Sequence, residues 1–255
     1  MENKKAQYTP TLDEALQKRV NELHQTTMPN FDNLKDEQIL QWHKNFWMMC
    51  ADDILKPQGR KFVIDENNRS VILFLLYYFN MDERALEVFP EKRYDLHKGV
   101  MLIGEVGAGK TLIMQAFERY LRMIKSPLAF RSTSVTEILN YYKVNEHIDY
   151  FTYNVGKNST EGHPVALCIN DVGLQTQKYF GNDMQVFVDE LFHARNEIYV
   201  QHALRTHLTT NLGPKEMKAV FEDAYGRLND RWNTYNVLKL PGKSRRKQKE
   251  ATNEN

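Results

Sequence analysis

A glycine-rich segment in the middle of the chain, GEVGAGKT at residues 104–111, restricts the fold more than any other stretch of the sequence. It follows a short apolar run at 100–103 and precedes a run whose apolar residues recur at helical spacing. A strand, a glycine loop and a helix in this order form a loop whose backbone N–H groups and helix N-terminus bind phosphate. The segment therefore predicts a parallel α/β unit that binds a nucleotide.

Each part of this loop has a predicted role at the phosphates. The glycines at 104, 107 and 109 allow successive N–H groups to curl around the β- and γ-phosphates. Lys110 supplies a positive charge to the same oxygens, and the hydroxyl of Thr111 is a ligand for Mg²⁺. The predicted contacts of ATP are Gly104, Glu105, Val106, Gly107, Ala108, Gly109, Lys110, Thr111 and Leu112.

From residue 94 onward, short apolar runs alternate with helical patterns, which favours an α/β fold with a mostly parallel sheet flanked by helices. Strands are expected at 99–103, 128–130, 165–169 and 204–211, and helices at 110–124, 134–143 and 182–200. Earlier in the chain, helical patterns lie at about 11–23, 36–55 and 67–80. We predict a helical partner-docking region at 1–90, an ATPase core at 91–242 and a basic, polar tail at 243–255.

Composition and charge exclude several classes of protein. The net charge is +1, so any binding of nucleic acid must depend on a local patch. The longest apolar run, at 71–79, is shorter than the roughly 20 residues that span a bilayer. Cys50 and Cys168 lack metal-ligand spacing and are expected to be reduced core residues. We therefore expect a cytoplasmic protein without membrane contact.

A second polar signal is the pair Asn170–Asp171, which ends the apolar run VALCI at 165–169. In such folds the strand beside the phosphate loop presents its carboxyl end to the metal. We expect the run at 165–169 to be that strand, so the pair is predicted to lie near the magnesium ion. Two assignments stay open. In the first, Asn170 holds the metal weakly and Asp171 polarises the attacking water, so Asn170→Asp would strengthen Mg²⁺ binding. In the second, Asp171 serves the metal and the catalytic base is unassigned. A plain turn at the strand end is the structural alternative.

Four segments together resemble one known family. They are KGVMLIGEVGAGKT at 98–111, CINDVG at 168–173, HLTTNL at 207–212 and YGRLNDRW at 225–232. In this order they are similar to motifs of the DnaC/IstB-like branch of AAA+ P-loop ATPases, which includes bacterial helicase loaders and transposition helpers. The resemblance covers about residues 94–246 and implies a AAA+ core whose lid domain is absent or minimal. The family's usual acidic pair is Asn-Asp here, which implies slow hydrolysis.

The resemblance also implies roles for residues outside the loop. Asn211 corresponds to sensor 1, which orients water at the γ-phosphate, with Thr210 as a substitute. Arg231, or alternatively Arg227, corresponds to an arginine finger that reaches the nucleotide of a neighbouring subunit. Arg246 corresponds to sensor 2, whereas its neighbour Arg245 is expected to belong to a solvated tail.

Three functions are compatible with these signals. The first is a helicase loader, an ATP-dependent homo-oligomer that hydrolyses ATP with Mg²⁺ and delivers a replicative helicase onto single-stranded DNA. The second is a transposition helper that recruits a transposase on duplex DNA, and the third is an ATP-binding adaptor with vestigial hydrolysis. Two sets of aromatic residues are candidate contacts or, alternatively, core residues. The first set, which would stack on DNA bases and contact phosphates, is Tyr141, Tyr142 and Tyr153 with Lys143. The second set, which would anchor a protein partner, is Trp42, Phe46 and Trp47.

Overall fold

The computed structural model describes residues 36–155, 162–173, 184–213, 215–217 and 232–245. Within them, five strands form one sheet in the order β2-β3-β4-β1-β5, and every neighbouring pair is parallel. The strands are β1 Gly99–Ile103, β2 Arg131–Ser134, β3 Leu167–Val172, β4 Thr206–Thr210 and β5 Tyr235–Lys239. The predicted α/β fold with a parallel sheet flanked by helices is confirmed.

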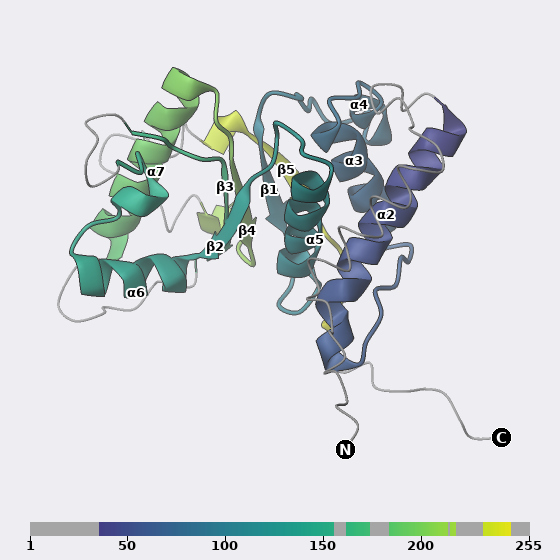
Figure 1. The fold of residues 1–255 in the computed structure, drawn as a ribbon, viewed down its shortest axis with the longest axis horizontal. Helices are drawn as coiled ribbons and strands as arrows, with labels where there is room; N and C mark the ends of the chain where they lie inside the picture. Colours follow the sequence, from purple (N-terminus) through teal and green to yellow (C-terminus); the bar gives the residue numbers. More distant parts are fainter. Residues whose placement is uncertain (1–35, 156–161, 174–183, 214, 218–231, 246–255) are drawn as a thin grey trace, which may run out of the picture.

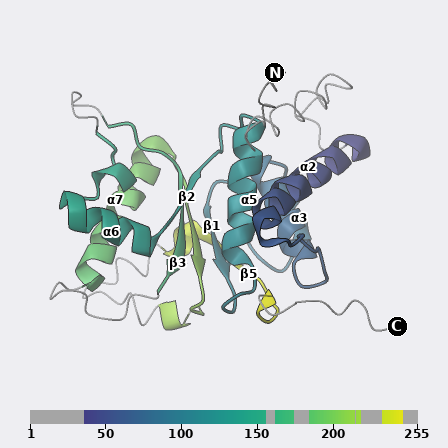
Figure 2. The same cartoon turned by 60° about the horizontal axis from the view of Figure 1, so that its bottom comes forward.

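Helices cover both faces of this sheet (Figures 1 and 2). One face carries α5 (Lys110–Met123), with α2 (Glu37–Leu55) and α3 (Arg69–Phe79) beyond it, and the other carries α6 (Val135–Asn145) and α7 (Met184–His202). Side chains alternate along β1 as a pleated strand requires. Val100 and Leu102 therefore pack into the core on the α5 side, and Met101 and Ile103 into the core on the α6 side. The short elements are η1 Lys56–Gln58, α4 Ala85–Val88, η2 Asp149–Phe151 and η3 Trp232–Thr234.

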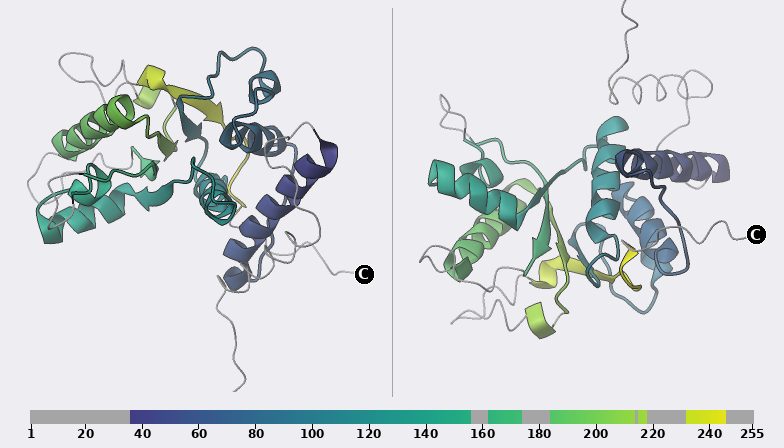
Figure 3. Two further views of the ribbon diagram at one scale, coloured as in Figure 1. Left: turned by 45° about the horizontal axis from the view of Figure 1, so that its top comes forward. Right: turned by 90° about the horizontal axis from the view of Figure 1, so that it is seen from below.

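Aromatic side chains fill the core on the α5 side, where α2 packs against α5 (Figure 3). The helix α2 begins at the N-cap Asp36, whose carboxylate accepts the N–H groups of Gln38 and Ile39. Phe46 and Trp47 are 2% and 1% exposed, so these two candidate anchors are core residues, while Trp42 is half-buried. The boundary at residue 90 and the docking role of the residues before it stay predictions.

Most of the predicted elements are confirmed to within a few residues, but the second strand and the last one differ from the sequence-based expectation. The apolar run at 128–130 precedes the strand, which begins at Arg131 and reads RSTS. β2 is an edge strand, and three of its four residues are only half-buried, so its polar composition is usual. β5 was not predicted because its sequence, YNVLK, contains a polar residue at a core position. That residue, Asn236, is buried and bonds the backbone of Asp95 in both directions.

The aromatic stretch at 141–154 packs partly against the core on the α6 side. Tyr141 stacks on Tyr150 with ring centroids 5.6 Å apart, and the guanidinium of Arg131 lies 4.0 Å from the centre of the Tyr150 ring. Tyr153 donates its hydroxyl hydrogen to Glu197. Lys143 is exposed and Tyr142 is half-buried. A contact between this stretch and DNA stays a prediction.

Cys50 and Cys168 are both free and fully buried, as expected from their spacing. No helix within the described ranges is long and apolar enough to cross a membrane.

Two buried histidines are expected to make the stability of the fold depend on pH. Nδ1 of His43 lies 2.6 Å from the hydroxyl of Tyr120, and Nδ1 of His207 accepts the N–H of Val100. Burial lowers the pKa of His43 to about 4. Burial, with the charges of Arg205 and Arg195, lowers the pKa of His207 to about 3. In the unfolded chain both would titrate near 6.5, so between these values the unfolded state binds more protons than the folded state.

We therefore expect stability to fall as the pH drops from 6.5 toward 4, by about 1.4 kcal/mol per pH unit for each histidine. Urea unfolding at several pH values measures this slope. In His43→Gln the change of unfolding free energy with pH should decrease by the contribution of one histidine. His97→Gln, at an exposed position, should leave this change at the wild-type value. Parallel slopes in the wild type and His43→Gln would contradict the assignment.

Candidate nucleotide-binding site

The loop between β1 and α5 has the backbone conformation that its glycines allow. Gly107 and Gly109 have φ values of 81° and 102°, in the left-handed region that other residues rarely adopt. A Cβ atom on Gly107 would lie 2.3 Å from Oγ of Ser244, so this position has no room for a side chain. Gly109 is also the N-cap of α5, whose first backbone N–H groups have no partner within the helix. The loop and the helix N-terminus together present a site for an anion.

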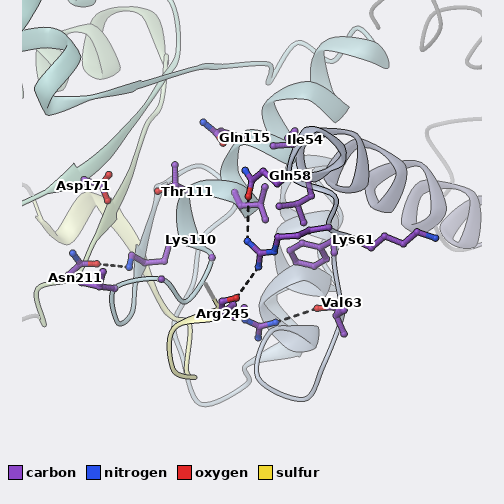
Figure 4. Close-up of a pocket in the computed structure, with 17 residues that line it drawn as sticks. Ile54, Gln58, Lys61, Val63, Lys110, Thr111, Gln115, Asp171, Asn211 and Arg245 are labelled. Carbon is purple, nitrogen blue, oxygen red and sulfur yellow. Dashed lines mark hydrogen bonds between the residues drawn. The ribbon is translucent and has the colours of Figure 1, made fainter. Parts of the chain in front are cut away.

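Lys110 is held at the base of this loop. Lys110 is only 5% exposed, and its Nζ donates to the carbonyl oxygens of Gly104 and Glu105 at 2.7 and 2.9 Å. Nζ also donates to Oδ1 of Asn211 at 2.6 Å (Figure 4). The loop lysine is therefore fixed by its own loop and by the residue that follows β4.

The sheet order decides which residues surround the loop. The strand beside β1 on this side is β4 and not β3, which corrects the expectation that the strand of the Asn170–Asp171 pair adjoins the phosphate loop. Asn211 thereby lies against Lys110, and Asp171 approaches from the next strand (Figure 4). Lys110, Thr111, Asp171 and Asn211 all line one pocket of about 550 Å³.

The structure separates the two residues of the polar pair. Asp171 lines the pocket and has a left-handed φ of 58°. Asn170 is 3% exposed and does not line the pocket. Its Nδ2 donates to the carbonyl oxygen of Thr133, and its Oδ1 accepts the hydroxyl hydrogen of Thr209, both at 3.1 Å. Of the three predicted metal residues, Thr111 and Asp171 reach the pocket and Asn170 does not.

The two candidates for sensor 1 also differ in position. Thr210 is fully buried, and its hydroxyl donates to the carbonyl oxygen of Val172 at 2.6 Å. Asn211 lines the pocket. Among the predicted residues, Arg227, Arg231 and Arg246 lie outside the described part of the chain, as does the helical pattern at 11–23.

Sequence reasoning missed one whole wall of the pocket. The end of α2 and the turn after it supply these residues of the pocket lining: Ile54, Leu55, Gln58, Arg60, Lys61, Phe62 and Val63. The carboxylate of Asp52 fixes this turn by accepting the N–H of Phe62 at 2.7 Å. The signal available in the sequence was a basic pair, Arg60–Lys61, directly after a Pro-Gln-Gly turn.

The structure also corrects the expectation that Arg245 belongs to a solvated tail. Arg245 is half-buried, its backbone N–H donates to the carbonyl oxygen of Gly107 at 3.0 Å, and its guanidinium lies 2.7 Å from the carboxylate of Asp65. Arg60 donates to the carbonyl oxygen of Arg245 at 2.9 Å. The segment that ends at Arg245 therefore joins the glycine loop to the opposite wall of the pocket.

No protein-family model and no curated protein matches the chain. Among solved structures, the chain matches DnaI with 18% identity and a TM-score of 0.48, over 74% of this chain and 89% of that one. It matches the DnaC helicase loader with 14% identity and a TM-score of 0.47, over 70% and 93%. Its fold is similar to that of these proteins.

A third match is DnaA from Aquifex aeolicus bound to AMPPCP, with 18% identity and a TM-score of 0.43. It covers 70% of this chain and 48% of DnaA, so the match spans about half the length of that protein. At these identities the likeness is one of fold. The chemistry of the site follows from the residues of this chain.

Those residues fit a nucleotide with magnesium. Mg²⁺ is usually bound through one or two carboxylates together with phosphate oxygens, and it retains several waters. Among the residues that the structure describes, the pocket offers one carboxylate, Asp171, and one hydroxyl at the start of α5, Thr111. The other charged residues in this described lining are cationic, Arg60, Lys61, Lys110 and Arg245. An excess of positive charge suits a polyphosphate.

We expect the Asp65–Arg245 ion pair to support nucleotide affinity, because it holds the two walls together. Arg245→Gln or Asp65→Asn should weaken ATP binding by up to about fivefold, since such a partly exposed pair contributes about 1 kcal/mol or less. Burial raises the pKa of Asp65, but the hydrogen bond and charge of Arg245, with the N–H groups of Asn68 and Asn67, more than offset this, and the pKa lies below its usual value.

The matched control is the Arg84–Asp82 pair, which has the same 2.7 Å separation and does not line the pocket. Arg84→Gln and Asp82→Asn should leave ATP affinity at the wild-type value in a fluorescence titration. Equal affinities for the Arg245→Gln variant and the wild type would show that this ion pair does not support the site.

Proposed function

We propose that this protein binds ATP with Mg²⁺ in the pocket beside the glycine loop and hydrolyses it. The observation that carries the proposal is the position of Lys110, which is buried at the start of α5 and bonded to the loop and to Asn211. A lysine held in this way, beside a glycine loop and at the N-terminus of a helix, is the arrangement by which P-loops bind phosphates.

The other residues of the pocket have separate roles in this proposal. The N–H groups of Val106, Gly107 and Gly109, with Lys110, hold the phosphates, whereas the N–H groups of Gly104 and Ala108 donate to backbone carbonyl oxygens. Thr111 and Asp171 would hold the magnesium ion, which would neutralise charge on the phosphate oxygens. Because Asn170 is bonded inside the sheet, the geometry supports the second assignment, in which Asp171 serves the metal. Asn211 then orients the attacking water, and the catalytic base is not among the residues assigned here.

We assign the protein, within this function, to the helicase-loader type of AAA+ ATPase. The support is the resemblance of four segments, in order, to that branch of the family. In this proposal an ATP-dependent homo-oligomer acts on a replicative helicase and single-stranded DNA. Arg231, with Arg227 as alternative, completes the site of a neighbouring subunit, and Arg246 contacts the γ-phosphate.

A second candidate is an ATP-binding adaptor with vestigial hydrolysis. The observation that favours it is the amide at position 170, where the family usually has a carboxylate. A transposition helper differs from the loader in the nucleic acid that it binds, which is duplex DNA.

Oligomer size and DNA binding with and without Mg²⁺-ATP separate these functions. For a loader we expect larger species by light scattering in ATP only, tighter binding of a single-stranded oligonucleotide than of a duplex, and measurable ATP hydrolysis. A preference for duplex DNA would support the transposition helper, and ATP binding without turnover would support the adaptor. Failure to bind ATP at millimolar concentration would overturn the proposed function itself.

A further inference from the structure

The strand β3 contains a bulge at the point where its polar pair lies. Ile169 pairs with Leu208 of β4, and Val172 pairs with Thr210. Two residues of β3, Asn170 and Asp171, therefore face the single residue Thr209. A bulge of this kind releases one residue from the alternation of a strand and can redirect its side chain. Here the released residue is Asp171, whose φ is 58°.

A chain of hydrogen bonds holds this bulge together. The hydroxyl of Thr209, which is fully buried, accepts the N–H of Asp171 at 3.1 Å and donates to Oδ1 of Asn170 at 3.1 Å. Nδ2 of Asn170 then donates to the carbonyl oxygen of Thr133 in β2 at 3.1 Å. The side chains of Asn170 and Thr209 thereby connect β2, β3 and β4 directly beneath Asp171.

We propose that Asn170 and Thr209 are positioning residues, which fix the backbone of Asp171 so that its carboxylate enters the pocket. This inference rests on the proposed function, because it assigns Asp171 to the metal. Position 170 requires an amide, since the carbonyl oxygen of Thr133 can only accept a hydrogen bond and an ionised carboxylate has none to donate. A carboxylate here would also be a buried charge next to the carbonyl oxygen of Thr133.

The inference reverses the expected effect of one substitution. If Asn170 held the metal weakly, Asn170→Asp would lower the Mg²⁺ concentration required for binding. If Asn170 positions Asp171, the same change breaks the bond to Thr133 and raises that concentration. Partners that orient a metal ligand typically affect metal affinity by about 10- to 100-fold, so the difference is measurable.

The test measures binding of a fluorescent ATP analogue at increasing MgCl₂, together with the midpoint of thermal unfolding. We expect Asn170→Asp and Thr209→Val to raise the half-maximal Mg²⁺ concentration by about tenfold or more. Affinity for the analogue without Mg²⁺ should stay at the wild-type value, because the loop and Lys110 provide it. Thr209→Ser keeps the hydroxyl and should restore the wild-type Mg²⁺ requirement.

The matched control is Thr133→Val. Thr133 is a buried threonine in the same sheet, but only its backbone oxygen takes part in the chain of bonds, while its hydroxyl donates to Glu137. This variant should therefore keep the Mg²⁺ requirement even if its unfolding midpoint falls. A general loss of structure would instead weaken analogue binding with and without Mg²⁺ in proportion to the loss of stability.

Two results would overturn the inference alone. One is a half-maximal Mg²⁺ concentration in Asn170→Asp that is lower than in the wild type, and the other is an unchanged value in Thr209→Val. Both apply when analogue binding to the wild type depends on Mg²⁺. A wild type that binds no analogue, or binds it without any Mg²⁺ dependence, would overturn the proposed magnesium-nucleotide site and the inference with it. The wild-type titration therefore distinguishes the two failures.

Discussion

Lys110→Ala is expected to lower ATP affinity by about 100-fold or more and to abolish turnover. Each hydrogen bond to a charged group contributes about 1.5–3 kcal/mol, and the lysine is the cation closest to the loop that would hold the phosphates. The bonds from Nζ to Gly104, Glu105 and Asn211 are lost as well, so the loop loses the side chain that organises it. A fluorescence titration with ATP and a steady-state assay of phosphate release measure both effects.

The fold should survive this change, because most of the core lies away from the lysine. Thermal unfolding of Lys110→Ala checks this point, and Lys92→Ala, at an exposed position outside the pocket, is the matched control. Unaltered ATP affinity in a folded Lys110→Ala protein would contradict the assignment of the loop.

Asp171→Asn is expected to separate binding from hydrolysis. The glycine loop and Lys110 are untouched, so ATP should still bind. The change removes the only carboxylate among the described residues that line the pocket. We expect the hydrolysis rate to fall by about 100-fold or more, since metal ions supply several kcal/mol of charge stabilisation in such reactions. The amide has nearly the same shape as the carboxylate, so stability should change little.

The informative measurement on Asp171→Asn is a magnesium titration of nucleotide binding and of hydrolysis. Loss of the Mg²⁺ dependence of binding would identify Asp171 as the metal residue. Retained Mg²⁺ dependence with loss of hydrolysis alone would instead make Asp171 the group that polarises water, and the metal residue would have to lie elsewhere in the pocket.

The part of the site that sequence predicts is the part built from one continuous segment. The residues of 104–111 lie together because a strand, a loop and a helix follow one another, and local periodicity is sufficient to identify all three. Asn211 and Asp171 depend on strand order, which periodicity does not contain. Asn211 reaches Lys110 only because β4 lies between β1 and β3.

Asn170 and Asn236 show a different limit of sequence reasoning. Both are polar residues at core positions of strands, and both are satisfied by backbone groups distant in sequence, at Thr133 and at Asp95. From sequence alone, the first is interpreted as a metal ligand, and the strand that contains the second is not predicted. Their partners, which lie 37 and 141 residues away, decide their actual roles.

The wall formed by the end of α2 gives that helix a mechanical property. With 19 residues at 1.5 Å each, α2 is a rod of about 28 Å. One end, at Ile54 and Leu55, lines the pocket, and its middle rests on α5 through Trp47 and Phe117, whose ring centroids are 5.1 Å apart. A rigid rod that tilts about such a contact moves its two ends in opposite directions. Trp47 lies about 15 Å from Glu37 and about 12 Å from Leu55 along the helix axis, so a displacement of the pocket end would be transmitted to the start of the helix at about the same size.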